Sequence, residues 1–142
     1  MPPALKEMID LLENLPESER RESLIAFAEQ ADAFAPHGDE AFAFEEVRHD
    51  RFCSDVVGIH LRLDTAGKVF FAVSLGPKIQ TLTRALVAIL ARGLNGSSTD
   101  EILSLSSDFI PRLVGSDLVR LRSQTVSYIF HRLQGALRQA MA

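Results

Sequence analysis

The spacing of apolar residues divides the chain into helical segments at both ends and a pair of strands between them. Near the N-terminus, apolar residues recur at intervals of three and four, which predicts a helix over residues 4–14 and a second helix from about residue 16 to residue 33. Leu15-Pro16 separates the two helices. The side chains expected to face the core are Leu5, Met8, Ile9, Leu11 and Leu12 in the first helix and Leu24, Ile25, Phe27 and Ala28 in the second.

The pattern breaks down between residues 34 and 50. An acidic stretch is followed by Phe42, Phe44 and Val47, whose spacing suits a short extended piece. We expect a long and largely irregular connection here. Such stretches in a small domain are often functional loops, and a flexible tether is the common alternative.

Residues 57–63 and 69–75 carry large apolar residues at every second position, which predicts two strands. A three-residue loop, Thr65-Ala66-Gly67, with Gly67 at a positive φ would join them as a hairpin. That loop length places apolar residues opposite one another on one face. The expected pairs are Leu63–Val69, Leu61–Phe71, Ile59–Val73 and Val57–Leu75.

Helical spacing returns after Gly76-Pro77 and predicts a helix that ends at Asn95-Gly96. Ser98 and Glu101 have the spacing of a capping box, so a short helix is expected to follow, with a further turn or two at residues 108–113. The longest helix is expected from about Arg122 to Met141. Its expected core side is Val126, Ile129, Phe130, Leu133, Leu137 and Met141, with Arg122, His131, Arg132 and Arg138 mostly elsewhere.

Helices, then strands, then helices, without alternating strand and helix units, predict an α+β fold. We expect a single domain over residues 1–142, in which a small antiparallel hairpin or sheet packs against several helices, including a long C-terminal helix. The length of 142 residues, with 46% hydrophobic and 24% charged residues, suits one globular domain.

Composition argues against several classes of function. No apolar run reaches the roughly 18 residues of a membrane span, and the first residues lack the pattern of a signal peptide, so we expect a cytoplasmic protein without a membrane partner. A net charge of −4 without a basic run argues against nucleic-acid binding. The chain shows no phosphate-binding loop or nucleophile elbow, and we expect no metal site because the histidines are dispersed: His37, His49, His60 and His131.

Cys53 is the only cysteine, so it cannot form a disulfide within the chain. Arg51 and His49 lie near it in the sequence, and cations lower the pKa of a thiol towards the reactive thiolate. A cysteine protease would need more architecture than the pair His49 and Cys53. Phe52 and Val56 could equally bury the thiol as an apolar filler. The residues alone leave both interpretations of Cys53 open, a reactive thiol and a buried apolar filler.

Several short motifs follow one another along the chain. They are Cys53 with Val57, the helix around Arg84-Ala85-Leu86-Val87-Ala88, Ser98-Thr99-Asp100-Glu101-Ile102-Leu103, and Arg122-Ser123-Gln124. Together with the two N-terminal helices and the hairpin, their order resembles the SufE family of sulfur-acceptor proteins over most of the chain. The family usually has Gly before its cysteine and Ser-x-Val-Trp two residues after it, whereas this chain has Phe52 before and Asp55-Val56-Val57-Gly58 after. Thr99 and Thr125 also stand where the family usually has Pro and Gly.

The resemblance implies a sulfur carrier in iron–sulfur cluster assembly. Cys53 would accept persulfide sulfur from a SufS-like cysteine desulfurase, stimulate that enzyme, and pass the sulfur to a SufBCD-like scaffold. Arg122 would stabilise the thiolate or hold its loop, and His49 is a weaker candidate activator. The resemblance also implies that the chain is not a stand-alone enzyme and has no cofactor of its own, since pyridoxal phosphate belongs to the desulfurase. The alternative is a non-catalytic interaction module with a structural Cys53.

Overall fold

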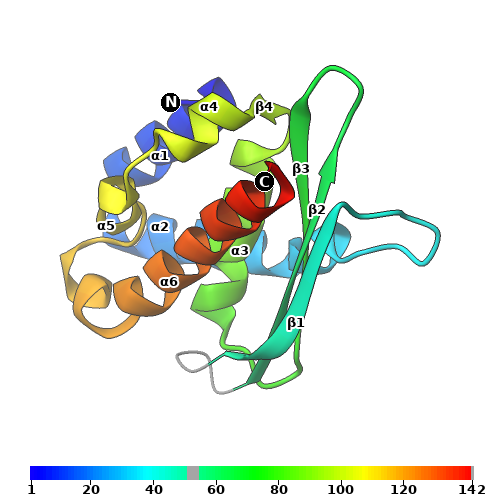
Figure 1. Cartoon of the computed structure of the whole chain (residues 1–142). Helices are drawn as coiled ribbons and strands as arrows, with labels where there is room; N and C mark the ends of the chain where they lie inside the picture. Colours follow the sequence, from blue (N-terminus) through cyan, green and yellow to red (C-terminus); the bar gives the residue numbers. More distant parts are fainter. Residues whose placement is uncertain (51–54, 142) are drawn as a thin grey trace.

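A computed structural model of the chain describes residues 1–50 and 55–141, without the side chains of residues 50 and 116–126. The helices and strands lie in the predicted order and confirm the α+β class, including the long C-terminal helix (Figure 1). The elements are α1 (Pro3–Asn14), α2 (Glu17–Glu29), η1 (Ala31–Phe34), β1 (Phe44–Asp50), β2 (Asp55–Leu63), β3 (Lys68–Leu75), α3 (Thr81–Leu94), β4 (Ser97–Ser98), α4 (Thr99–Leu103), η2 (Ser107–Phe109), α5 (Ile110–Val114) and α6 (Ser116–Met141).

The four strands form one antiparallel sheet in the order β1-β2-β3-β4, and the main helices gather on one side of it (Figure 1). Alternate residues of β2 and β3 are buried on the face that packs against α3 and α6. We call this the inner face. The largest core side chains from these elements are Ile59, Leu61, Phe71, Leu86, Ile89, Leu90, Phe130, Leu133 and Leu137.

The hairpin of β2 and β3 has the predicted register. Leu63 lies opposite Val69 and Val57 lies opposite Leu75. The two pairs between them, Leu61–Phe71 and Ile59–Val73, are also as predicted. Gly67 has a φ of 79°, which permits the three-residue loop. The hydrophobic alternation was sufficient to determine this register, because a slip of one residue would turn every apolar side chain to the other face.

The predicted helix ends after the hairpin are also confirmed. Gly96, with a φ of 86°, follows the end of α3. Ser98 and Glu101 form the capping box at the start of α4: the Ser98 hydroxyl accepts from the Glu101 N–H at 3.2 Å, and the Glu101 carboxylate accepts from the Ser98 N–H at 3.1 Å. The sequence pattern did not predict β4, a two-residue strand.

Two element boundaries differ from the prediction. The expected irregular connection ends early, because the short extended piece suggested by the spacing of Phe42, Phe44 and Val47 is the strand β1, whose residues 44–50 pair with β2 over their full length. Polar Glu46 and Arg48 share the inner face of β1 with Phe44 and thereby hide the alternation. The last helix also starts earlier than expected, at Ser116, directly after Gly115 with its φ of 82°.

Some apolar residues expected in the core are exposed. Leu11 is 54% exposed, because it lies beside the buried face of α1 rather than on it, and Ile25 is 47% exposed on α2. Met141, at the last turn of α6, is 51% exposed. Among the described residues, no helix combines the length and apolar character that a bilayer crossing requires.

Candidate functional site

The predicted site residues belong to β1, to the connection between β1 and β2, and to α6. Cys53 falls in residues 51–54, outside the described part of the chain, which begins again at Asp55. The backbone of Arg122 is helical within α6, but its side chain is also outside the described part. His49 is described: it lies near the end of β1, opposite Val56, and it is exposed. The structure therefore defines the surroundings of the predicted site through the ends of β1 and β2.

The inner face of β1 is tied to α6 by a buried arginine. Arg132 is 8% exposed and binds the Glu46 carboxylate at 2.9 Å. Its guanidinium also donates to the backbone carbonyls of Val57 at 3.1 Å and Glu46 at 3.2 Å. One side chain thus joins α6 to both strands that lead into residues 51–54. The prediction that Arg132 lies away from the core side of its helix is wrong, because this carboxylate and these carbonyls make its burial possible.

A second arginine extends this arrangement along β1. Arg48 shares Glu46 with Arg132, at 3.2 Å, and donates to the Tyr128 hydroxyl of α6 at 2.9 Å. Its guanidinium also lies 5.7 Å from the centre of the Tyr128 ring. The pKa of Arg48 is raised, and the hydrogen bond to Tyr128 is the largest cause. Two guanidinium groups therefore share one carboxylate between β1 and α6.

Asp55 fixes the start of β2 to the turn between β3 and α3. Its carboxylate accepts from the backbone N–H groups of Val56 and Lys78, each at 2.7 Å. These hydrogen bonds lower the pKa of Asp55, and the one from the Lys78 N–H has the largest effect. The charge of His49 makes a smaller contribution. Asp55 is thus a strand residue whose carboxylate has a defined structural role.

The turn that receives Asp55 requires a glycine. A Cβ atom at Gly76 would collide with the Asp55 carboxylate. Arg84 of α3 holds the same turn from the other side, since it donates to the carbonyls of Gly76 at 2.6 Å and Ile79 at 3.1 Å. The two residues that adjoin the undescribed segment are therefore anchored, Asp50 by its pairing with β2 and Asp55 by this turn.

The outer face of β2 explains one departure from the usual family sequence. His60 is 5% exposed and lies between Glu45, 2.7 Å from its Nδ1, and Ser74, 3.1 Å from its Nε2. Gly58, where the family usually has Trp, adjoins this histidine, and a Cβ atom there would collide with the Ser74 hydroxyl and lie 3.0 Å from His60 Nε2. A large side chain at position 58 is incompatible with this arrangement of His60.

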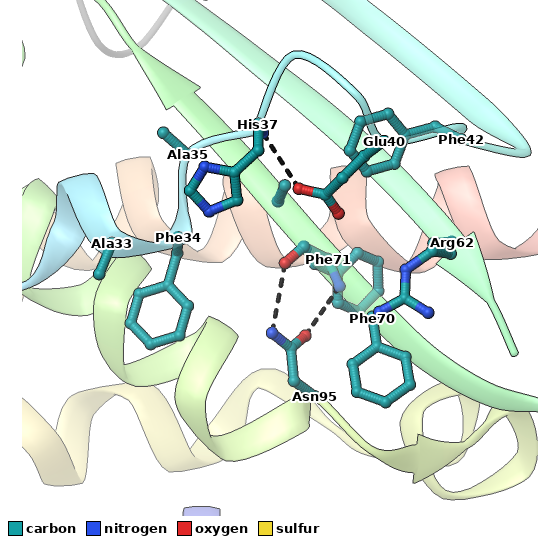
Figure 2. Close-up of a pocket in the computed structure, with 11 residues that line it drawn as sticks. Ala33, Phe34, Ala35, His37, Glu40, Phe42, Arg62, Phe70, Phe71 and Asn95 are labelled. Carbon is teal, nitrogen blue, oxygen red and sulfur yellow. Dashed lines mark hydrogen bonds between the residues drawn. The ribbon is translucent and has the colours of Figure 1, made fainter.

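A small cavity of about 140 Å³ lies on the outer face, between the segment after α2 and strands β2 and β3 (Figure 2). Phe34 and Phe42 line it together with Arg62, whose guanidinium lies 4.5 Å from the centre of the Phe70 ring. None of the described predicted site residues lines this cavity. Among the described residues, no group of three or more His, Cys, Asp or Glu side chains could hold a metal ion.

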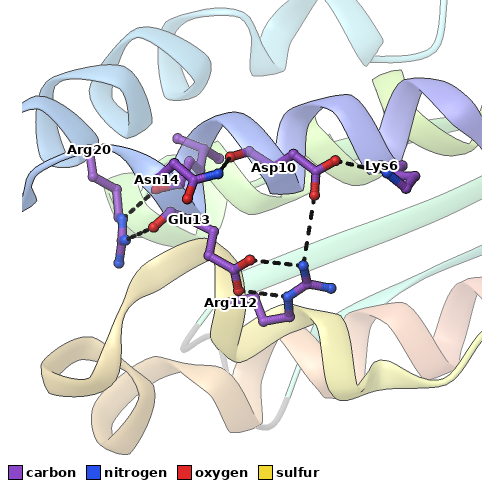
Figure 3. A network of polar contacts seen from close by, with 7 residues as sticks. Lys6, Asp10, Glu13, Asn14, Arg20 and Arg112 are labelled. Atoms are coloured by element: carbon purple, nitrogen blue, oxygen red, sulfur yellow. Dashed lines mark hydrogen bonds and ion pairs between the residues drawn. The ribbon is translucent and has the colours of Figure 1, made fainter.

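A polar cluster of α1, α2 and α5 lies on the helical side of the molecule (Figure 3). Arg112 binds both carboxylate oxygens of Glu13, at 2.7 and 2.9 Å. Arg20 donates to the carbonyls of Leu12 at 2.7 Å and Glu13 at 2.9 Å, at the C-terminal end of α1. No predicted site residue takes part in these contacts, so we assign this cluster to the packing of the helices.

Sequence reasoning missed the contacts between β1 and α6 that Glu46, Arg48, Tyr128 and Arg132 make. A signal was present: β1 carries Glu46 and Arg48 at alternate positions, and α6 carries Tyr128 and Arg132 at the four-residue spacing of one helix face. That signal cannot be interpreted without knowing that the face of α6 meets β1.

Comparison with known proteins supports both the fold and the family resemblance. A solution structure of a hypothetical protein from Thermus thermophilus is 23% identical, with a TM-score of 0.77 over 99% of this chain and 98% of that chain, and it supports the fold alone. No curated protein matches the chain. The family profile SufE, described as Fe-S metabolism associated domain, matches residues 6–137. Because this match spans nearly the whole chain, the protein belongs to the SufE family and acts in iron–sulfur metabolism.

Proposed function

We propose that the protein is a sulfur carrier that accepts persulfide sulfur on Cys53 from a SufS-like cysteine desulfurase and delivers it to a SufBCD-like scaffold. The observation that carries the proposal is the family match over residues 6–137, which includes the only thiol of the chain. On this proposal the protein stimulates the desulfurase and is not a stand-alone enzyme. It needs no cofactor of its own.

The transfer is a thiol–disulfide type of exchange without net oxidation. The Cys53 thiolate attacks the outer sulfur of a persulfide on the desulfurase cysteine, a new S–S bond forms on Cys53, and the old S–S bond breaks. The electron pair of the broken bond leaves with the desulfurase thiolate, which takes up a proton. A lone thiol suits this role, because a second cysteine nearby would convert the persulfide into a disulfide and release the sulfur.

The described surroundings support a carrier role, because the residues on either side of the undescribed segment are fixed to the rest of the fold. Cys53 is two residues from Asp55, which is hydrogen-bonded to the β3–α3 turn, and three residues from Asp50, which is paired in the sheet. The surrounding framework is fixed to α6 by the buried Arg132.

The described charges also bear on the reactivity of the thiol. Arg48 lies on the inner face of β1 and Arg132 on the neighbouring face of α6, and cations favour a thiolate. The negative charge of Asp55 opposes a thiolate, but two backbone N–H groups share that charge. We assign the main stabilisation of the thiolate to Arg122, with His49 as a weaker contributor.

The direct test is mass spectrometry of the protein after incubation with a cysteine desulfurase and free cysteine. We expect one added sulfur atom on Cys53, removed by a reductant, and faster turnover of the desulfurase. Cys53→Ser should abolish both effects while binding to the desulfurase persists. Normal stimulation by Cys53→Ser would falsify the carrier role and favour the alternative, an interaction module with a structural cysteine.

A second experiment separates the proposed helpers of the thiol. Alkylation of Cys53 by iodoacetamide as a function of pH reports the thiol pKa without any partner. Arg122→Ala should raise that pKa and slow sulfur transfer, while Arg122→Lys should retain much of the effect because it keeps the charge. His49→Ala should have a smaller effect. An unchanged alkylation profile in Arg122→Ala would remove Arg122 from the site.

A further inference from the structure

The cavity on the outer face of the sheet combines aromatic walls with charged groups (Figure 2). Phe34 and Phe42 come from the segments after α2 and before β1, and Phe70 comes from β3. Arg62 of β2 and Glu40 also line the cavity. Apolar walls with a few convergent polar groups are typical of a site for a small molecule. None of these residues belongs to the predicted sulfur-transfer site.

The guanidinium of Arg62 has hydrogen-bond donors available for a ligand. Of the arginines whose side chains are described, only Arg62 and Arg138 have neither a hydrogen bond nor an ion pair to another described residue, and Arg138 is exposed on α6. Arg62 is half-buried, and its guanidinium lies over the ring of Phe70, 4.5 Å from the ring centre. Stacking on a ring leaves the N–H groups at the edge of a guanidinium free, and these fit a carboxylate with two parallel hydrogen bonds.

Glu40 supplies a negative charge to the same cavity. Its Oε1 accepts from the His37 backbone N–H at 3.0 Å, and this bond holds the carboxylate beside the cavity (Figure 2). Among the described residues, its Oε2 has no hydrogen-bond donor, and Glu40 and Arg62 form no ion pair with each other. A simple carboxylate would be attracted by Arg62 and repelled by Glu40. A ligand that fits both groups therefore carries a negative group for Arg62 and a positive group for Glu40.

The size of the cavity limits the apolar part of such a ligand. Its volume of about 140 Å³ is close to the roughly 150 Å³ of an engineered apolar cavity that binds benzene. The cavity therefore has room for one ring or a branched aliphatic group, and aromatic walls pack well against either. Asn95 also lines the cavity, but its amide is bonded to the backbone N–H and C=O of Phe71, at 2.7 and 3.3 Å. Arg62 and Glu40 are thus the groups that select the charges of the ligand.

We propose that this cavity binds a free α-amino acid with an apolar side chain about the size of one ring. Its carboxylate binds Arg62, its ammonium group binds Glu40, and its side chain lies between the aromatic rings. The adjacent carboxylate and ammonium groups of an amino acid match both charges of the cavity, whereas an acid or an amine matches only one. Because the site is small and open to solvent, we expect a dissociation constant on the order of 1 mM. Binding there requires neither Cys53 nor a desulfurase.

Titration of the full chain with L-phenylalanine, followed by two-dimensional ¹H–¹⁵N NMR, tests the proposal. We expect saturable shifts of the backbone amide signals of residues that line the cavity, such as Phe70 and Ala72. Arg62→Met keeps an apolar side chain over Phe70 but should weaken binding at least about fivefold. Arg138→Met, which removes an unpaired but exposed guanidinium, is the matched control and should leave the dissociation constant unchanged. No saturable shift up to about 20 mM, or an equal constant in Arg62→Met, overturns the proposal.

Two analogues of phenylalanine test the assignment of the charges. 3-Phenylpropanoate lacks the ammonium group and phenethylamine lacks the carboxylate, so each should bind at least about threefold more weakly than phenylalanine. Glu40→Gln keeps an acceptor for the His37 N–H but removes the charge, and it should weaken binding of phenylalanine without weakening that of 3-phenylpropanoate. Arg62→Gln should weaken binding of phenylalanine but not of phenethylamine. If 3-phenylpropanoate binds as tightly as phenylalanine, the cavity does not recognise an amino acid. The spectrum of each variant shows whether the fold is retained.

Discussion

Two arginine–carboxylate pairs hold the two ends of this molecule, and they differ in burial more than in geometry. Arg112 and Glu13 join α5 to α1 at 2.7 and 2.9 Å, and both side chains are about as accessible as each other, 44% and 40% (Figure 3). Arg132 and Glu46 join α6 to β1 at 2.9 Å, but the Arg132 side chain is only 5% exposed. Water can replace the partner of Arg112 but has little access to Arg132. The structure therefore depends much more on the pair beside the cysteine segment.

The largest expected effect comes from removing the buried arginine. Arg132→Met keeps much of the side-chain volume but removes the hydrogen bonds to Glu46 and to the Val57 carbonyl. We expect the free energy of unfolding to fall by about 2–3 kcal/mol, measured by urea denaturation. Tyr128, the only tyrosine in a chain without tryptophan, allows fluorescence to follow the contact between α6 and β1 in the same experiment.

Arg132→Lys is the control for charge alone. It should recover part of the stability, because an ammonium group cannot make the same forked contacts to a carboxylate and two carbonyls. If Arg132→Met were as stable as the wild type, the contrast between the two ends of the molecule would be wrong.

The next effect tests the turn that anchors Asp55. Gly76→Ala would place a methyl group where the Asp55 carboxylate lies, so either the turn or the start of β2 must shift. We expect a loss of about 1–3 kcal/mol in the free energy of unfolding. Gly38→Ala is a matched control, since nothing lies within 4 Å of its added Cβ. A loss of equal size in Gly38→Ala would mean that backbone freedom, not the collision with Asp55, is responsible.

The fold was predictable where one pattern decided the outcome. In the hairpin of β2 and β3, a single register buries all apolar residues, and the Ser98–Glu101 spacing defines a helix start by local hydrogen bonds alone. β1 was not predictable in the same way, because Glu46 and Arg48 occupy its inner face. Arg132 and Tyr128 of α6, distant in the sequence, explain why Glu46 and Arg48 are acceptable there.

The surroundings of the site were less predictable than the fold. Cys53 was singled out because it is unique in the chain, and its role, with those of Arg122 and His49, stays a prediction. Arg132 was expected to lie away from the core because arginine on a helix is usually solvated. Its burial depends on carbonyls and a carboxylate from β1 and β2, and no periodicity within α6 contains that information.

A smaller effect is expected from the response of Asp55 to acid. The pKa of Asp55 lies below its usual 3.8, so its contribution to stability is complete above that value and is lost as the pH falls through the folded-state pKa. Asp55→Asn should therefore be less stable than the wild type at neutral pH, with a difference that shrinks as the pH falls below 3.8 in a urea denaturation series. Because backbone N–H groups are the main cause, added salt should change this difference little. A difference that grew on acidification would contradict this assignment.

The smallest effect is expected at the exposed pair. Arg112→Met removes the same guanidinium as Arg132→Met, but Glu13 can exchange it for water. The Arg112 hydrogen bond is the main cause of the lowered pKa of Glu13, so the variant should lose a little stability at neutral pH and none at pH values where Glu13 is protonated. High salt should remove most of the difference, because the attraction at an exposed pair is screened. A loss in Arg112→Met that matched Arg132→Met and resisted salt would show that pair geometry, rather than burial, determines how strongly each end is held.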